Sequence, residues 1–307
     1  MPLHIQTPLI ASLPMSQRLG RPIWLKMEAL QPPGSFKLRG VGLACEHHAA
    51  RGARRFLSSS GGNAGLAVAW AGRQLGIAVL VVVPQTTSAV ALHNLRLEGA
   101  SVLVHGASWQ EAHAYALSLQ TEGDAFIHPF DDPLLWQGHA TLMNEVAATG
   151  LRPAAVVLSV GGGGLLCGVV QGLQALDWHD VPVLAVETQG AASLNAALLA
   201  QERVVLERIT SVATSLGARQ VCAQAFALAH EHPVHSLVVS DAQAVDACVD
   251  FLNDHRLVVE PACGAALAGA ACTALDLPPK APVLVVVCGG ATSTAAQLLA
   301  QQAQLQR

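Results

Sequence analysis

Three short motifs carry the groups whose types and spacing could do chemistry. The first, QPPGSFKLRG at residues 31–40, presents one lysine, Lys37, ahead of a helix on a Gly- and Pro-lined turn that the prolines make rigid. The second, SSSGGNAG at residues 58–65, is rich in hydroxyl, amide and backbone N–H groups, and the third is a run of four glycines at residues 161–164. Together they predict an enzyme whose cofactor is held covalently by an amine and electrostatically through a phosphate.

Lys37 lies between the apolar residues Phe36 and Leu38. Apolar neighbours that remove water from an amine lower its pKa, and the amine then becomes a nucleophile and a base. A single lysine is more often an exposed surface charge, so the motif by itself leaves both interpretations open.

The glycine run follows an apolar strand, residues 154–160, and precedes a helix. Consecutive glycines let several N–H groups point at one anion, and the helix N-terminus adds favourable potential, so we expect a phosphate. The alternative is a turn needed for tight strand–helix packing. A nucleoside-triphosphatase P-loop is excluded because no Lys-Ser/Thr pair follows. The G-x-G-x-x-G dinucleotide motif also fails, since Leu166 or Cys167 occupies its last position.

Asn63 and Cys288 are further candidates at the ends of predicted strands. Asn63 either caps a helix or joins a pocket of N–H, hydroxyl and amide groups for a carboxylate or phenolate. Cys288 either packs in the core or reaches a site at the carboxyl edge of the sheet. The stretch HEHPVH at residues 230–235 contains a proline that breaks any helical face, which argues against a metal site.

Short β-rich runs alternate with Ala- and Leu-rich helical runs, which predicts parallel-rich α/β sheets with helices on both faces. A break near residues 129–136, with the turn signal Asp-Asp-Pro, predicts two lobes with a cleft between them. We expect a large domain of residues 1–35 and 136–307 and a small domain of residues 36–135. The expected strands cover residues 55–59, 77–83, 101–104, 125–127, 155–160, 183–187, 236–239 and 283–287. The expected helices cover residues 63–75, 88–98, 109–121, 164–176, 192–200, 242–255, 264–274 and 295–305.

Composition excludes several classes of protein. Of the 307 residues, 12% are charged and 52% are hydrophobic, and the net charge is −4, which excludes a disordered chain and argues against nucleic acid as a partner. The uncharged stretches 153–176 and 281–306 are interrupted by glycine or polar residues, so we expect no membrane span. No signal peptide is evident, and seven cysteines without a C-x-x-C pair indicate reduced thiols and a cytoplasmic location.

Taken together, the motifs resemble the serine dehydratase (L-serine/L-threonine ammonia-lyase) group of pyridoxal-phosphate enzymes. The resemblance runs from about residue 7 to residue 302 and implies the two-lobed tryptophan-synthase β-like fold (PLP fold type II). The matching stretches are PPGSFKLRG, SSSGGNAG, HPFDDPLLWQGH, SVGGGGLLCGVVQGL, VETQGAAS, VEPACGAAL and VVVCGGATS.

The resemblance also implies roles for single residues. Lys37 would be the Schiff-base lysine and the α-proton base, with Phe36 beside the pyridoxal ring and Cys288 facing the ring nitrogen. The loop that binds the substrate carboxylate and the cofactor's 3′ oxygen would comprise Ser60, Gly61, Gly62 and Asn63. The phosphate cradle would comprise Gly161, Gly162, Gly163 and Gly164. A monovalent-cation site, expected to hold K⁺, would comprise Gly161, Glu187, Ala191, Ser193, Leu216 and Ala218.

The implied reaction is β-elimination of L-serine, and also of L-threonine, to pyruvate or 2-oxobutanoate plus ammonia, a step of amino-acid catabolism. A thiol at Cys288 is too weak an acid to protonate the ring nitrogen, so the ring stays neutral and elimination is favoured over transamination. A homodimer is expected.

Two alternatives stay open. One is an amino-acid racemase of the same fold, but racemase relatives carry a serine where this chain has Gly61 and an acidic residue where it has Ser193. The other is a non-catalytic module that binds pyridoxal phosphate. More active dehydratases carry alanine at the position of Gly61, so we predict that Gly61→Ala raises serine turnover.

Overall fold

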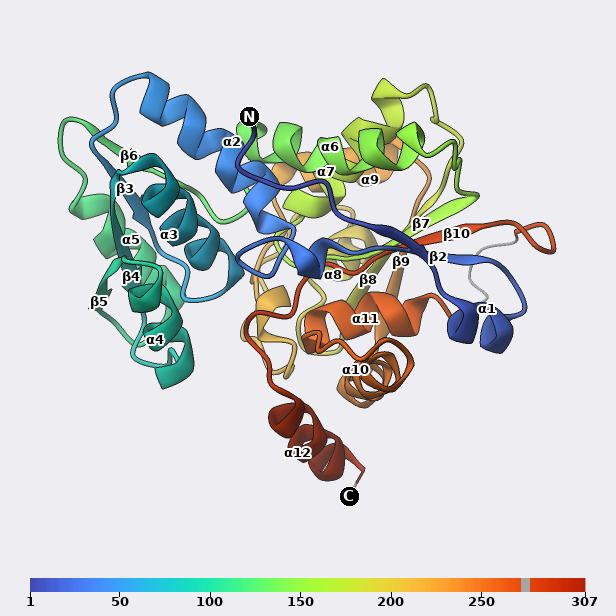
Figure 1. Cartoon of the computed structure of the whole chain (residues 1–307). Helices are drawn as coiled ribbons and strands as arrows, with labels where there is room; N and C mark the ends of the chain where they lie inside the picture. The colour runs from blue at the N-terminus through green and yellow to red at the C-terminus, as the bar shows by residue number, and fades with distance from the viewer. Residues whose placement is uncertain (272–276, 307) are drawn as a thin grey trace.

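The computed structural model describes residues 1–271 and 277–306, and its strands form two separate sheets (Figure 1). The six-stranded sheet has the order β1 (Leu9–Ala11), β2 (Ile23–Lys26), β10 (Val283–Val286), β7 (Ala155–Ser159), β8 (Val183–Thr188), β9 (Val234–Val239). The four-stranded sheet has the order β5 (Ser101–Val104), β4 (Ala78–Val83), β3 (Arg55–Ser58), β6 (Asp124–Phe126). Every pairing is parallel except that of β1 with β2.

Helices cover both faces of the large sheet, with α6 and α7 on one side and α10 and α11 on the other (Figure 1). The helices of this part are α1 (Leu13–Leu19), α6 (Pro133–Ala148), α7 (Gly164–Ala175), α8 (Ser193–Ala200), α9 (Ala223–Glu231), α10 (Asp241–His255), α11 (Pro261–Gly269) and α12 (Ala295–Leu305). Around the small sheet lie α2 (Lys37–Ala50), α3 (Asn63–Leu75), α4 (Ala89–Leu97) and α5 (Trp109–Ser118), and two 3₁₀ turns cover Glu28–Leu30 and Thr214–Leu216. The predicted fold class is confirmed.

The central strands explain the apolar composition. Every residue of β7, β8 and β10 is buried, because a parallel strand covered on both faces has no side exposed to water. Their sequences therefore read as continuous Val- and Leu-rich runs instead of alternating patterns. Among the described residues, no helix is both long and apolar enough to cross a membrane.

Some elements differ from those expected. The Asp-Asp-Pro signal, interpreted as a turn between lobes, is the start of α6: Asp132 Oδ1 accepts from Leu134 N at 2.8 Å and Pro133 occupies the first helical turn. Strands β1 and β2 and helices α1 and α9 were also missed. Helix α11 begins at Pro261, earlier than expected, and residues 272–274 of the expected helix lie outside the described residues.

A buried ion network fixes α2 against the large sheet. Arg39 Nε lies 2.7 Å from Glu28 Oε2, and Arg39 Nη1 lies 2.7 Å from Glu145 Oε1. Lys26 of β2 also bonds to Glu145 of α6. Because two cations meet two carboxylates, the buried charges are balanced, and the first turn of α2 is tied to both β2 and α6.

Candidate active site

The carboxyl end of β10 holds the turn that precedes α2. Phe36 N donates to Cys288 O at 2.9 Å, and Gly290 N donates to Gly34 O at 3.1 Å. Ser35 and Gly289 form an antiparallel bridge between the same two segments. These contacts bring the first residue of α2, Lys37, next to the Cys288 loop, although 251 positions separate the two residues in the sequence.

Lys37 is half-buried in this structure and its amine has a defined partner. Its Nζ donates to Pro129 O at 2.6 Å and lies 5.0 Å from the centre of the Phe36 ring. Burial lowers the pKa of Lys37 to about 8, although the nearby Glu260 acts in the opposite direction. At pH 7.5 roughly a quarter of such amines are neutral, which makes Lys37 a competent nucleophile and base.

The glycine run forms a cradle between β7 and α7 that side chains would obstruct. A Cβ on Gly162 would lie 2.2 Å from the Phe130 ring, and one on Gly164 would lie 2.7 Å from Phe130 O. Gly163 has φ +95°, and a Cβ there would lie 2.4 Å from that of Ala225. In the described part of the chain the N–H groups of residues 162–164 have no backbone acceptor. Free N–H groups at the start of a twelve-residue helix suit a phosphate.

Asn63 is the first residue of α3 and is bound by a glutamate that the sequence analysis missed. Its Nδ2 donates to Glu260 Oε1 at 2.7 Å, and Thr292 Oγ1 donates to Glu260 Oε2 at 2.5 Å. Asn63 Oδ1 is buried and has no hydrogen-bond partner among the described residues. An unpaired buried acceptor here fits a ligand that donates a hydrogen bond. The sequence signal available was a glutamate directly before the proline of α11.

The rest of the polar loop lies between β3 and α3. Ser60 Oγ accepts from Gly62 N at 3.3 Å. A Cβ on Gly61 would lie 2.8 Å from Thr87 Cγ2 and 3.2 Å from Thr87 Oγ1, so Thr87, which the sequence analysis did not single out, forms the wall behind this loop. The loop therefore has its N–H groups at a helix N-terminus and little spare room at Gly61.

Cys288 is buried at the end of β10. Its Sγ lies 3.5 Å from Ser159 Oγ, a second residue that the sequence analysis missed. The hydrogen bond with the Cys263 thiol, together with burial, raises the pKa of Cys288 well above its ordinary value. Cys288 is therefore an uncharged thiol at neutral pH.

Several of the expected cation ligands lie together around the start of α8. Ser193 Oγ lies 3.5 Å from Gly161 O, and a Cβ on Gly161 would lie 3.0 Å from Leu216 Cα. Ala218 N donates to Leu216 O at 2.8 Å.

Glu187, the charged member of this set, is fully buried at the end of β8. Its carboxylate oxygens accept from Leu194 N and Asn195 N, both at 2.8 Å, and burial raises its pKa to about 7. The remaining expected backbone ligand, Ala191, precedes the same helix, and its N–H donates to Thr188 O at 2.9 Å.

Within the part of the chain that the structure describes, no group of three or more His, Cys, Asp or Glu side chains is arranged to hold a metal ion. A cation beside Glu187 would therefore depend on backbone and hydroxyl oxygens. His232 of the HEHPVH stretch is hydrogen-bonded to Val181 O at 2.8 Å.

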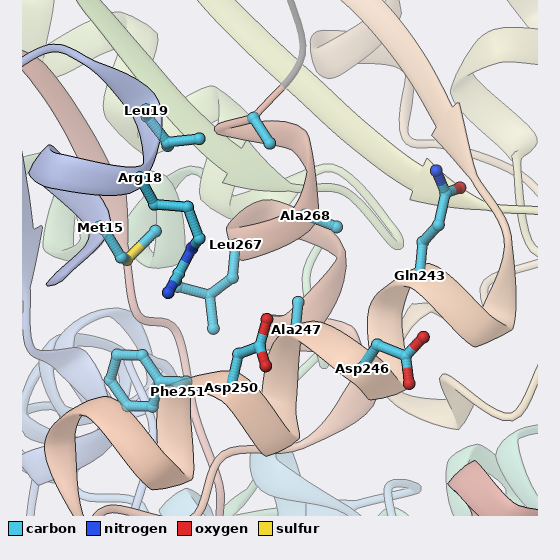
Figure 2. A pocket seen from close by; sticks show the side chains of 11 residues that line it. Met15, Arg18, Leu19, Gln243, Asp246, Ala247, Asp250, Phe251, Leu267 and Ala268 are labelled. Atoms are coloured by element: carbon cyan, nitrogen blue, oxygen red, sulfur yellow. The ribbon is translucent and has the colours of Figure 1, made fainter.

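A cavity of about 260 Å³ lies elsewhere, between α1, α10 and α11 (Figure 2). Its walls combine apolar side chains such as Phe251 and Leu267 with Arg18 and Asp250. None of the candidate site residues lines it.

Comparison with known proteins gives a consistent result. Residues 1–289 match the family described as "Pyridoxal-phosphate dependent enzyme". The chain is 48% identical to a Mus musculus protein named "L-serine dehydratase/L-threonine deaminase", over 99% of this chain and 96% of the relative. It is similar to the crystal structure of a fungal L-serine ammonia-lyase from Rhizomucor miehei, with 36% identity, a TM-score of 0.94 and 99% of each chain covered. The chain shares its fold with maize serine racemase, with 22% identity, a TM-score of 0.88, and 99% of this chain and 93% of that chain covered.

Proposed function

The chain belongs to the pyridoxal-phosphate-dependent enzyme family, and on this premise we propose that it eliminates water and ammonia from L-serine, and from L-threonine, to give pyruvate or 2-oxobutanoate. The observation that carries the proposal is the junction of α2 with the end of β10, which brings an amine with a pKa of about 8 beside an uncharged thiol. A base of this strength can remove a proton from Cα at neutral pH.

The residues present fit the cofactor. Lys37 would hold it covalently, the N–H groups of residues 161–164 its phosphate, Asn63 its 3′ oxygen and Cys288 its ring nitrogen, with Phe36 beside the ring. The free N–H groups of the glycine run support this assignment. When bound, pyridoxal phosphate supplies the electron sink that makes the Cα proton of an amino acid removable.

The protein's own contribution is to place and move protons. With its amine free and donating to Pro129 O, Lys37 Nζ would take the proton from Cα. The substrate carboxylate binds in the loop of Ser60, Gly61, Gly62 and Asn63, where N–H groups and the α3 N-terminus favour a negative charge.

Cys288 bears on the choice of reaction. Because its pKa is raised, the thiol neither carries a negative charge nor gives a proton to the ring nitrogen. A ring left neutral would be a moderate electron sink, which would favour loss of the Cα proton and of the β-hydroxyl as water over transamination. Racemisation needs a second acid or base opposite Lys37, and Gly61 has no side chain to provide it.

A monovalent cation, K⁺, is proposed beside Glu187, with oxygens of Gly161, Ala191, Ser193, Leu216 and Ala218. The buried Glu187 carboxylate supports the proposal, because a cation would lower the pKa that burial raises. Comparing turnover in K⁺ with turnover in Na⁺ and in a large organic cation tests it; equal rates in all three would contradict it.

The domain division, a homodimer and a cytoplasmic location stay predictions. Two features of the sheets support the expected division. Strands β3–β6 form a sheet of their own, as expected for a small domain of residues 36–135, and β1 and β2 lie beside β10, as expected for a large domain of residues 1–35 and 136–307. The six cysteines among the described residues are all free thiols, which supports a reducing compartment.

The chain has three lysines, which makes the central test simple. Pyridoxal phosphate reduced onto the protein with borohydride should label Lys37 and leave Lys26 and Lys280 unlabelled. Lys37→Ala should lose the visible absorption and keto-acid formation from L-serine, whereas Lys280→Ala should keep both. Keto-acid formation by Lys37→Ala at the wild-type rate, or D-serine as the sole product from L-serine, would overturn the proposal.

A further inference from the structure

The turn between β6 and α6, residues 128–132, contacts two parts of the proposed site at once. Pro129 O accepts the hydrogen bond from Lys37 Nζ at 2.6 Å. The next residue, Phe130, places its ring where a side chain on Gly162 would lie, and its carbonyl accepts from Trp136 Nε1 at 2.9 Å. One short segment thus touches both the amine and the glycine cradle.

His128 gives this turn its shape. Its Nδ1 accepts from Asp131 N at 2.8 Å and from Phe130 N at 3.2 Å, as an aspartate or asparagine oxygen does in an Asx turn. Its ring meets the Phe130 ring edge-on, with centroids 4.8 Å apart and planes at 80°. Burial lowers the pKa of His128 to about 4, with smaller contributions from His113 and Lys37. The ring is therefore neutral at neutral pH, and Nδ1 can accept both hydrogen bonds.

A terminal amine rotates freely unless one of its hydrogens is engaged. The bond from Lys37 Nζ to Pro129 O engages one hydrogen, which restricts where the lone pair of the neutral amine points. The direction of the Pro129 carbonyl depends in turn on the two N–H groups that His128 accepts, because both belong to the residues that directly follow Pro129.

We propose that His128 is a positioning residue: by fixing the turn that carries the Pro129 carbonyl, it orients the amine of Lys37 for proton removal and for condensation with the cofactor aldehyde, which releases water. The role in proton removal rests on the proposed function. The role in the reaction with the aldehyde needs only the amine and an aldehyde, and can be tested without any amino-acid substrate.

The competing explanation is that His128 fills space. Its ring lies near those of His113 and Phe126, with centroids 5.8 and 6.4 Å away, and His113 Nδ1 lies 3.0 Å from Ser59 Oγ. A filler can be replaced by an apolar side chain of similar volume, whereas an acceptor for two N–H groups cannot. His128→Leu and His128→Asn separate these roles, since leucine fills the space and asparagine retains an acceptor suited to this turn.

Two measurements are made on these variants and on His93→Leu, a control at an exposed histidine of α4. The first is the rate at which the cofactor-free protein takes up pyridoxal phosphate, followed by visible absorption. The second is kcat and KM for L-serine with the loaded enzyme.

For His128→Leu we expect uptake and kcat to fall at least tenfold, with KM changed less than threefold. His128→Asn should stay within threefold of the wild type in both rates, and His93→Leu should match the wild type.

Wild-type uptake by His128→Leu, or uptake by His128→Asn as slow as that of His128→Leu, would overturn the inference. If the wild type forms no keto acid from any substrate, the proposed function fails, and the uptake series still decides whether His128 orients Lys37.

Discussion

Gly61 and Thr87 together control how much room there is in the loop of residues 60–63, where we propose that the substrate carboxylate binds. The Gly61→Ala substitution places a Cβ 2.8 Å from Thr87 Cγ2, closer than van der Waals contact, and 3.2 Å from Thr87 Oγ1. Thr87 is half-buried, with its N–H bonded to Pro84 O at 3.0 Å, so it has to move for the new methyl to fit. Overpacking of this kind costs about 1–3 kcal/mol when the neighbour cannot adjust.

We therefore expect Gly61→Ala to raise serine turnover only partly in the natural chain. In a Thr87→Ser background the crowding Cγ2 is gone and the hydroxyl is retained, so the gain should be larger. A coupling of about 1 kcal/mol corresponds to roughly a fivefold larger gain in kcat/KM. The double-mutant cycle is measured by coupling pyruvate formation to lactate dehydrogenase, with Thr86→Ser as the matched control at the adjacent exposed threonine.

Equal effects of Gly61→Ala in the two backgrounds would refute the steric argument. If Gly61→Ala lowers serine turnover in the Thr87→Ser background, this refutes the premise that the missing methyl at residue 61 leaves the substrate loosely placed. The same coupling with Thr86→Ser would show that the effect is not specific to Thr87.

Three further predictions concern groups around Lys37. Burial lowers the pKa of Lys37 to about 8, so we compare its rate of pyridoxal-phosphate uptake with the rate for a free lysine side chain in the same buffer. The ratio of the two rates should be constant below pH 8 and fall about tenfold per pH unit between pH 8 and pH 10, because only the free amine continues to lose protons there; a ratio that stays constant up to pH 10 would contradict the lowered pKa. Glu260→Ala should weaken binding of pyridoxal phosphate about tenfold because Asn63 loses its hydrogen-bond partner. Glu260→Gln keeps an acceptor for Asn63 and should bind the cofactor within threefold of the wild type. Titration of the visible absorption measures both affinities. Glu28→Ala leaves the buried Arg39 short of one carboxylate and should lower the free energy of unfolding in urea by about 3–5 kcal/mol, and a loss below 1 kcal/mol would show the network to be unimportant.

Local sequence patterns were sufficient for many elements. The helices over residues 63–75 and 295–305 and the strand over residues 101–104 have the predicted bounds. Their signals are short-range: apolar periodicity, a serine or threonine cap such as Thr294, and glycine where the chain turns. Helix α6 was missed because a proline after two aspartates marks a turn and a helix start equally well, and only the bond from Leu134 N to Asp132 distinguishes them.

Lys37, the glycine run, Asn63 and Cys288 could be singled out from the sequence because each lies in a short motif with a chemical meaning. Their partners could not. Pro129 is 92 positions from Lys37, and Glu260 is 197 positions from Asn63. Neither has a local pattern that sets it apart from other loop prolines or helix-start glutamates.

The sequence by itself determined most of the segments that become strands and helices, because those choices depend on neighbours within a few residues. Only the tertiary structure decided which loops at the ends of these strands and helices lie next to one another. The insertion of β10 between β2 and β7 puts Cys288 beside the Lys37 turn and the glycine run, and the turn after β6 then supplies the carbonyl for Lys37. Strand order is a property of the whole packed sheet, so no short stretch of the chain encodes it.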